Sequence, residues 1–177
     1  MKIQAQWWAG LLMAVWSVAS AADINTLQRL NETGTLRVGY GDTAPFSYTD
    51  DEGNVLGYSI ELCQRVAAQL QQQLGLPNLD IEYVFRTPGN RVQLLNSGDI
   101  DIECNASTNN AERRRSAEFS LSHFFVSVRF VALKENQFLT LQDLAGRSVS
   151  VARGTVNVSQ INQANRERQL NLSVVPV

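Results

Sequence analysis

The strongest constraint on the fold is that short β-type segments alternate with amphipathic helical segments along most of the chain. Strands separated by helices pair in parallel sheets, with the helices as crossover connections. The pattern predicts an α/β fold, with a break in the alternation near Glu135–Phe138. We expect strands at 36–40, 81–85, 100–102, 148–152 and 172–177, and helices at 23–32, 60–74, 91–96 and 156–168.

Local signals refine this pattern. Ser59 is the expected N-cap of the helix over 60–74, and Gly75 is its expected end. The apolar run Phe124–Leu133 predicts a long strand that leaves one lobe and enters another. Thr140, with Asp143 three residues later, predicts a short capped helical turn. The last strand–helix–strand unit has only about 40 residues, which is small for an independent core, so we expect a C-terminally truncated fold.

The stretch Asp99–Arg115 (DIDIECNASTNNAERRR) predicts an anion-binding loop. Isoleucines alternate with acids at its start, as in a strand, and Asn109 followed by Glu112 fits the capping box of a helix. The small, hydroxyl-rich loop between them offers backbone N–H groups to an anion, and Arg113 adds a guanidinium in the first helical turn. The stretch contains no nucleophile beside a base, so it favours binding of a carboxylate over catalysis.

Residues 1–21 have the features of a secretory signal peptide. Lys2 supplies the positive start, and Ala9–Val18 is an apolar run too short to span a bilayer comfortably. Ala19-Ser20-Ala21 fits a cleavage site with small residues, and a retained membrane anchor is the alternative. Cleavage would release the mature chain into an oxidising compartment outside the cytoplasm.

Composition and motifs exclude several classes of protein. The formal net charge of -2, without a basic stripe, argues against a nucleic-acid partner. Hydrolase, metalloprotease and phosphate-loop motifs are absent, and His123 has no cysteine or acid cluster near it in sequence, so we predict no catalytic site, no metal and no cofactor. Cys63 and Cys104 form either a disulfide or two buried thiols.

Six motifs follow one another along the chain: LRVGY, APFSY, GYSIELC, NRVQLLNSGDIDIEC, STNNAERRRSAEFS and TLQDLAGRSVSV-x-x-GT. Together they resemble periplasmic solute-binding proteins of amino-acid ABC importers, most of all the glutamate/aspartate-binding branch. The resemblance covers Asp23–Val177 and is most specific from Asn90 to Ser120. It implies a periplasmic-binding-protein-like, two-lobed clamshell, with residues 22–133 as lobe one and 134–177 as the start of an incomplete lobe two.

The resemblance also implies which residues hold the ligand. Arg113 matches the arginine that binds the ligand's α-carboxylate, and Thr108 matches the hydroxyl residue beside it. Arg91 matches an arginine that reaches the side-chain carboxylate of acidic ligands, and Thr155 matches a carboxylate contact from the second lobe. The other implied positions are Ala106 and Ser107, through loop contacts, and Phe46 on the cleft loop, for which core packing is the alternative.

Three departures from the acidic-ligand branch bear on specificity. Gly41-Asp42-Thr43 stands where that branch has an arginine, Pro88 replaces a serine, and Asn105-Ala106 replaces a Gly-Ser pair. These departures favour recognition of an α-carboxylate over a fixed acidic specificity.

The resemblance implies a monomeric periplasmic receptor, not an enzyme, that captures an amino acid and delivers it to inner-membrane ABC permease subunits. One alternative is a dehydratase-like enzyme of the same fold, which would need a general acid or base in the cleft. The other is a truncated, non-transporting remnant, which would lack a cooperative thermal transition.

Overall fold

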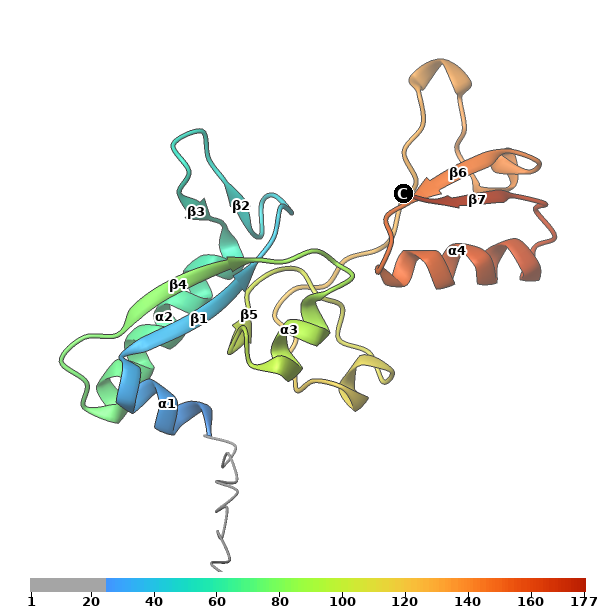
Figure 1. Cartoon of the computed structure of the whole chain (residues 1–177). Helices are drawn as coiled ribbons and strands as arrows, with labels where there is room; N and C mark the ends of the chain where they lie inside the picture. Colours follow the sequence, from blue (N-terminus) through green and yellow to red (C-terminus); the bar gives the residue numbers. More distant parts are fainter. Residues whose placement is uncertain (1–24) are drawn as a thin grey trace, which may run out of the picture.

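The computed structural model describes residues 25–177, so the expected signal peptide at 1–21 lies outside the described residues. Two α/β units follow each other along the chain (Figure 1). The first contains the blue-to-green elements, the second contains the orange-to-red elements near the C-terminus, and an irregular segment joins them. Within residues 25–177, the helices are too short or too polar to cross a membrane.

A three-stranded parallel sheet forms the centre of the first unit, in the order β4-β1-β5. Val38 of the middle strand pairs with Tyr83 on one side and Ile102 on the other. A two-stranded antiparallel hairpin, β2-β3, lies outside this sheet. The elements of the unit are α1 (Thr26–Thr33), β1 (Thr35–Tyr40), β2 (Tyr48–Thr49), β3 (Val55–Leu56), α2 (Tyr58–Leu74), β4 (Asp80–Phe85), α3 (Arg91–Ser97) and β5 (Ile102–Glu103).

The first unit buries one apolar core between α2 and the sheet. The apolar stripe of α2 faces the middle strand because apolar residues recur at helical spacing. Cys63 of α2 and Cys104, just after β5, are joined by a disulfide with a Cα–Cα distance of 6.3 Å. The buried core residues are Leu30, Leu36, Val38, Ile60, Ala67, Leu79 and Cys104.

The start of α2 differs from the prediction. Gly57, not Ser59, holds the N-cap position, with φ at 128°. A side chain on Gly57 would collide with the backbone of Phe46, so the chain needs a glycine there. Ser59 lies inside the first turn, and its hydroxyl donates to the carbonyl of Asn105 at 3.0 Å. The predicted end of the helix at Gly75 is confirmed, since Gly75 adopts a left-handed conformation.

The second unit is the predicted strand–helix–strand. β6 (Ser148–Val151) and β7 (Ser173–Pro176) pair in parallel, and α4 (Val156–Glu167) connects them. A short 3₁₀ turn, Leu141–Leu144, precedes them and begins with the predicted capping box. The buried core of the second unit is small and consists of Leu144, Leu170 and Leu172.

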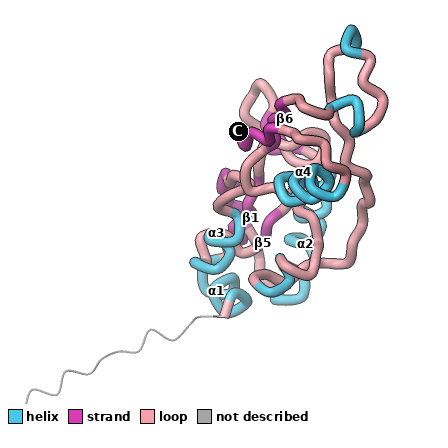
Figure 2. Tube along the Cα trace, turned by 90° about the vertical axis from the view of Figure 1, so that its right-hand side faces the viewer, coloured by secondary structure: helices cyan, strands magenta, loops and turns pink. Residues whose placement is uncertain are grey.

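The predictions for the connecting segment, residues 105–139, are wrong in two places. Phe124–Leu133 forms no strand, because no neighbouring strand among the described residues pairs with it, and its side chains are largely exposed, with Val131 at 98%. The expected helix after Asn109 is a single 3₁₀ turn, Arg113–Arg115, and the Asn110 side chain accepts a hydrogen bond from the Arg113 N–H at 2.9 Å. Figure 2 shows the long loops, in pink, between the helices and strands.

Candidate anion-binding site

The candidate site lies at the carboxyl ends of the three parallel strands. β1, β4 and β5 run in the same direction, so Gly41, Arg86 and Cys104 leave the sheet at the same edge. In open α/β sheets, ligands bind outside this edge. The polar loop after β5 begins here.

Arg86 and Glu103 form a buried ion pair at this edge. The Arg86 Nη2 atom lies 2.6 Å from Glu103 Oε1, and the two side chains are only 5% and 9% exposed. Burial lowers the pKa of the Arg86 guanidinium, while the Glu103 carboxylate opposes that shift. Ser107 donates its hydroxyl hydrogen to the same Glu103 oxygen at 3.0 Å. The ion pair thus fixes the loop predicted to bind an anion.

Arg91 lies at the start of α3 and is buried, with an exposed fraction of 7%. Its Nη1 atom donates to the carbonyl of Pro88 at 2.7 Å, in the turn just before the helix. Its Nη2 atom donates to the carbonyl of Gly154 at 3.1 Å. Arg91 therefore connects the first unit to the turn between β6 and α4 of the second.

Arg113 is also held by two backbone carbonyls. Its Nη1 atom donates to the carbonyl of Thr108 at 3.2 Å, and its Nη2 atom lies 3.4 Å from the carbonyl of Gly154. Partial burial, and then repulsion from Arg91, lower the pKa of the Arg113 guanidinium. An arginine guanidinium does not lose its proton in proteins, so Arg113 keeps its positive charge.

The site therefore carries more positive than negative charge. Arg86, Arg91 and Arg113 influence one another electrostatically, and Glu103 is the acid that offsets them most directly. A positive excess in a partly desolvated place favours an anion, and guanidinium groups bind carboxylates with good geometry.

Two buried donors converge beside Gly41. Arg86 Nε and Asn105 Nδ2 are buried and find no hydrogen-bond partner among the described residues. A Cβ atom on Gly41 would lie 2.8 Å from Asn105 Nδ2 and 3.1 Å from Arg86 Cζ. A side chain at position 41 would therefore push against the Asn105 amide and the Arg86 guanidinium.

The structure places the remaining predicted site residues as follows. The backbone N–H of Ala106 donates to Asn105 Oδ1 at 2.6 Å. Thr155 is the N-cap residue of α4, but its hydroxyl donates to the carbonyl of Ala152 at 2.7 Å and does not cap the helix. Phe46 lies in an aromatic cluster, with its ring centroid 4.8 Å from that of Phe124. His123 lies beside Tyr58, and among residues 25–177 no three metal-ligating side chains gather.

Sequence reasoning missed Arg86, Glu103 and Gly154. Arg86 looks like an ordinary residue after a strand, and its role depends on Glu103, which is 17 positions away. Gly154 contributes a backbone carbonyl, which no side-chain pattern reveals. The glycine in the GT motif was the one available signal.

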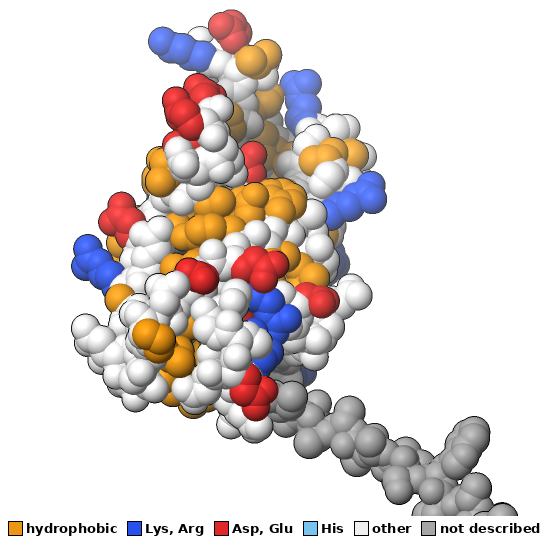
Figure 3. Space-filling view, turned by 60° about the vertical axis from the view of Figure 1, so that its left-hand side comes forward, with side chains coloured by type: hydrophobic (Ala, Val, Ile, Leu, Met, Phe, Trp, Pro, Cys, Tyr) orange, Lys and Arg blue, Asp and Glu red, His pale blue; other side chains and the backbone are white. Residues whose placement is uncertain are grey.

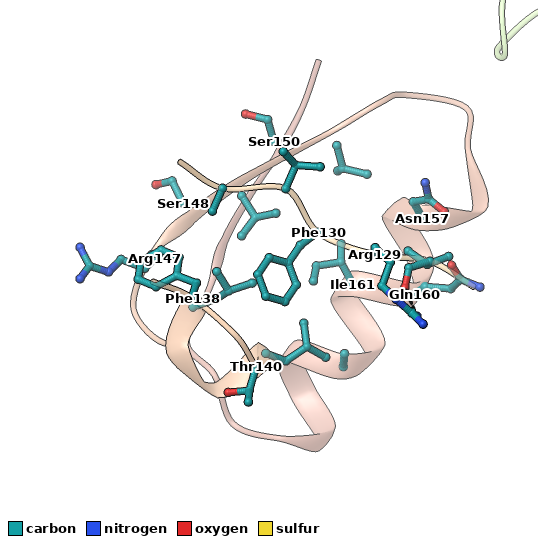
Figure 4. Close-up of a pocket in the computed structure, with 18 of the residues that line it drawn as sticks. Arg129, Phe130, Phe138, Thr140, Arg147, Ser148, Ser150, Asn157, Gln160 and Ile161 are labelled. Carbon is teal, nitrogen blue, oxygen red and sulfur yellow. Dashed lines mark hydrogen bonds between the residues drawn. The ribbon is translucent and has the colours of Figure 1, made fainter. Parts of the chain in front are cut away.

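A separate hollow of about 1230 Å³ lies between the connecting segment and the second unit (Figure 4). Phe130, Phe138 and Ile161 line its apolar part, and Arg147 lies with its guanidinium 5.6 Å from the centroid of the Phe138 ring. Neither Arg91 nor Arg113 lines it. On the face of the molecule shown in Figure 3, hydrophobic side chains form a broad patch, with acidic and basic side chains around it.

The fold and the site together define the class: an α/β protein with a candidate anion-binding site at the strand ends. The chain belongs to the bacterial extracellular solute-binding proteins, family 3, which match residues 36–172.

Curated relatives share about a third of its residues. An L-glutamate/L-aspartate-binding protein of Pseudomonas aeruginosa is 32% identical over 169 residues, covering 93% of this chain and 56% of the relative. An L-cystine-binding protein of Escherichia coli is 31% identical over 147 residues, covering 81% of this chain and 53% of the relative. The chain thus spans about half the length of these relatives.

Solved structures with the same two-lobed periplasmic-binding fold are also similar, and the chain covers part of that fold. The L-cysteine solute receptor of Neisseria gonorrhoeae matches with a TM-score of 0.73 and 26% identity, over 85% of this chain and 59% of that one. An ancestral amino acid-binding protein described as a precursor of cyclohexadienyl dehydratase matches with a TM-score of 0.67 and 25% identity, over 86% of this chain and 65% of that one.

Proposed function

We propose that this chain captures an amino acid in the periplasm and serves an ABC importer, with residues 22–133 as its first lobe and 134–177 as the start of its second. The observation that carries the proposal is the convergence of two guanidinium groups, from Arg91 and Arg113, on one acceptor position between the two units. A pair of arginines at such a position suits a carboxylate, which every amino acid carries.

Each predicted residue receives a role in this proposal. Arg113 binds the α-carboxylate, and Arg91 supplies a second guanidinium, which would reach the side-chain carboxylate of an acidic ligand. The loop at Ala106, Ser107 and Thr108 lies beside them, held by Glu103 through the Ser107 hydroxyl. Thr155 approaches from the second unit, next to Gly154. Phe46 is assigned to the aromatic cluster more than to the ligand, since its ring packs against Phe124.

The ligand is proposed to be an acidic amino acid or cystine, as the names of the curated relatives suggest. The acidic branch has an arginine in the loop where this chain reads Gly41-Asp42-Thr43, and here the Arg86 guanidinium lies beside Gly41. Binding, rather than catalysis, is proposed because the groups that converge here are arginines and an ion-paired carboxylate. A dehydratase-like activity would need an unpaired acid or base at this position.

The test is titration calorimetry on residues 22–177 with L-glutamate, L-aspartate, L-cystine and L-glutamine. We expect one of them to bind, and Arg113→Ala to weaken that binding by about 2–5 kcal/mol, or at least about 30-fold, because a charged partner is lost. Arg115→Ala is the matched control, since Arg115 is exposed and two positions away. Equal affinities for wild type and Arg113→Ala would contradict the assignment of the site.

Thermal melting provides a second measurement. A ligand at about 100 times its Kd should stabilise the chain by roughly 2.7 kcal/mol. A cooperative melt that no amino acid shifts would mean that the chain folds without a working site. The absence of a cooperative melt would favour the alternative of a non-transporting remnant.

A further inference from the structure

One carboxylate oxygen ties the end of one edge strand to the loop after the other. Glu103 Oε1 lies 2.6 Å from Arg86 Nη2, and it also accepts the hydroxyl hydrogen of Ser107 at 3.0 Å. Arg86 directly follows β4, and its backbone N–H donates to the carbonyl of Tyr40 at 2.8 Å. Glu103 is the last residue of β5. The Arg86–Glu103–Ser107 triplet therefore connects the carboxyl ends of the two edge strands.

The triplet orients the anion loop before any anion binds. A hydroxyl carries one hydrogen, and Ser107 donates it to Glu103, so this hydrogen is not available to a ligand. At the base of the same loop, the carbonyl of Asn105 accepts from the Ser59 hydroxyl at 3.0 Å. The loop is thus held at two points, one of which depends on Glu103.

Glu103 also brings a negative charge close to a candidate site for an anion. Burial, and then repulsion from Arg91, lower the pKa of the Arg113 guanidinium, whereas the Glu103 charge opposes this shift and the Arg86 charge adds to it. Both members of the ion pair therefore act on Arg113. Like charges placed next to each other weaken binding, so an uncompensated Glu103 would repel an anion held by Arg113.

Arg86 is too enclosed to reach the anion itself. The residue is only 4% exposed, its Nη2 atom is bound to Glu103, and its Nε atom is buried without a partner among the described residues. A buried charge whose partner is removed is strongly destabilising, which keeps Arg86 and Glu103 together. Any effect of Arg86 on binding therefore passes through Glu103.

We propose that Arg86 is a positioning residue of the anion site. It holds Glu103, which orients Ser107, and it offsets a negative charge that would otherwise repel the anion. Arg91 and Arg113 remain the groups that contact the anion. That the anion is an amino-acid carboxylate rests on the proposed function.

The experiment measures how tightly the full chain, purified in oxidised form from the periplasm of an expression host, binds inorganic sulfate. Sodium sulfate is titrated against sodium chloride at constant ionic strength, and the backbone amide resonances of Ala106, Ser107 and Thr108 are followed by nuclear magnetic resonance. We expect a saturable shift of these resonances in the wild type. If sulfate shifts none of them, the loop holds no anion and the inference is overturned.

Arg86→Met is the test variant, because methionine is unbranched and uncharged. We expect sulfate binding at pH 8 to weaken at least about tenfold, since the Glu103 charge is no longer offset. Arg37→Met is the matched control. Arg37 also pairs with a buried acid, Asp101, and its Nε atom is also buried without a partner, but it lies in the first half of β1, away from the site. Arg37→Met should bind sulfate as the wild type does.

The pH profile separates this role from a purely structural one. In Arg86→Met, protonation of Glu103 toward pH 4 removes the repelling charge, so sulfate binding should recover as the pH falls. The other charged groups that act on Arg113 are Arg91 and Glu112, and both remain in the double variant Arg86→Met/Glu103→Gln. The double variant should lose the recovery and should bind sulfate more tightly than Arg86→Met at pH 8.

Glu103→Gln tests the inference even if Arg86→Met does not fold. Glutamine keeps an acceptor oxygen for Arg86 and Ser107 but removes the negative charge, so sulfate should bind more tightly than in the wild type at pH 8. Equal or weaker binding would overturn the inference, because a residue that only holds the loop gives that result. Wild-type affinity in Arg86→Met, or a pH profile that Arg86→Met shares with the wild type, would also overturn it.

This design separates the inference from the proposed function. Failure of all four amino acids to bind, with the expected sulfate effects, would reject the proposed function and leave the role of Arg86 in place. Amino-acid binding together with unchanged sulfate affinity in Arg86→Met would do the reverse.

Discussion

The first and second units follow the same strand–helix–strand plan but differ in how completely that plan is realised. The first has a three-stranded sheet, a disulfide and seven buried core residues, whereas the second has two strands and three buried core residues. The apolar run between them forms no strand and exposes its side chains. The comparison teaches that apolar, β-prone sequence becomes a strand only where a neighbouring strand can satisfy its backbone.

Removing the charge of Glu103 should have the largest effect, and it should be confined to the first unit. Glu103→Gln leaves Arg86 buried without its countercharge, which costs about 3–5 kcal/mol of unfolding free energy. Urea unfolding followed by circular dichroism measures this loss. Changing Arg86 to Met in the same chain should recover much of it, and no recovery would mean that the pair is not the cause.

The disulfide should contribute almost as much to the unfolding free energy as the Arg86–Glu103 ion pair. The bridged cysteines are 41 positions apart, and closing a loop of that length stabilises the folded state by roughly 4 kcal/mol in the chain-entropy model. Replacing both cysteines by alanine should therefore speed hydrogen exchange in β1 and α2. Exchange in β6 and β7 is the internal control, and we expect it to stay as it is in the wild type.

A substitution that creates a cavity tests the small core of the second unit. Leu170 is fully buried, and Leu170→Ala should cost about 2–5 kcal/mol. Because only three buried residues form this core, we expect hydrogen exchange across β6, α4 and β7 to lose its protection together. Protection of β1 should persist, and a common loss in both units would show that they unfold as one.

Lowering the pH should destabilise the second unit through its capped turn, Leu141–Leu144. This should be the smallest of the four predicted losses of stability. Hydrogen bonds from the backbone of Thr140 and Leu139 lower the pKa of Asp143 below its ordinary value. The folded-state pKa is therefore below the unfolded value near 3.9, so the contribution of Asp143 is complete above about pH 4 and is lost as the pH falls through its folded pKa. Melting between pH 3 and 7 should show a loss that Asp143→Asn removes.

Asp50 in the first unit is the control for Asp143, because hydrogen bonds lower the pKa of its carboxyl group as well. The Asn54 side chain and backbone lower its pKa in the β2-β3 hairpin. Asp50→Asn should leave the acid sensitivity of the second unit unchanged. A reduction of that sensitivity by Asp50→Asn would contradict the assignment to Asp143.

Much of the fold follows from periodicity and from capping residues. The apolar stripe and Gly75 located α2, and Thr140 with Asp143 located the capped turn. Phe124–Leu133 was predicted wrongly, because its composition suits a strand but composition does not supply a partner. Ser59 was assigned to the N-cap, although the close approach of Phe46 places a glycine there and frees the serine to bond Asn105.

The candidate site was less accessible to sequence reasoning. Arg91 and Arg113 belong to local motifs, and the structure brings them to one oxygen. Arg86 and Glu103 meet only because β4 and β5 flank the same strand, and Gly154 acts through its main chain. Such relations are set by tertiary packing and leave no local signal. For the two cysteines the sequence left a disulfide and two thiols open, and the structure joins them.

The position of that disulfide has a consequence for the order of events during biosynthesis. Cys104 lies directly between Glu103, which holds Arg86 and Ser107, and Asn105, which accepts from Ser59. Oxidation of one sulfur pair thus fixes the residue from which the anion loop departs. A chain in a reducing compartment lacks this anchor, so the proposed function implies an order of maturation: export first, oxidation second, and ligand capture last.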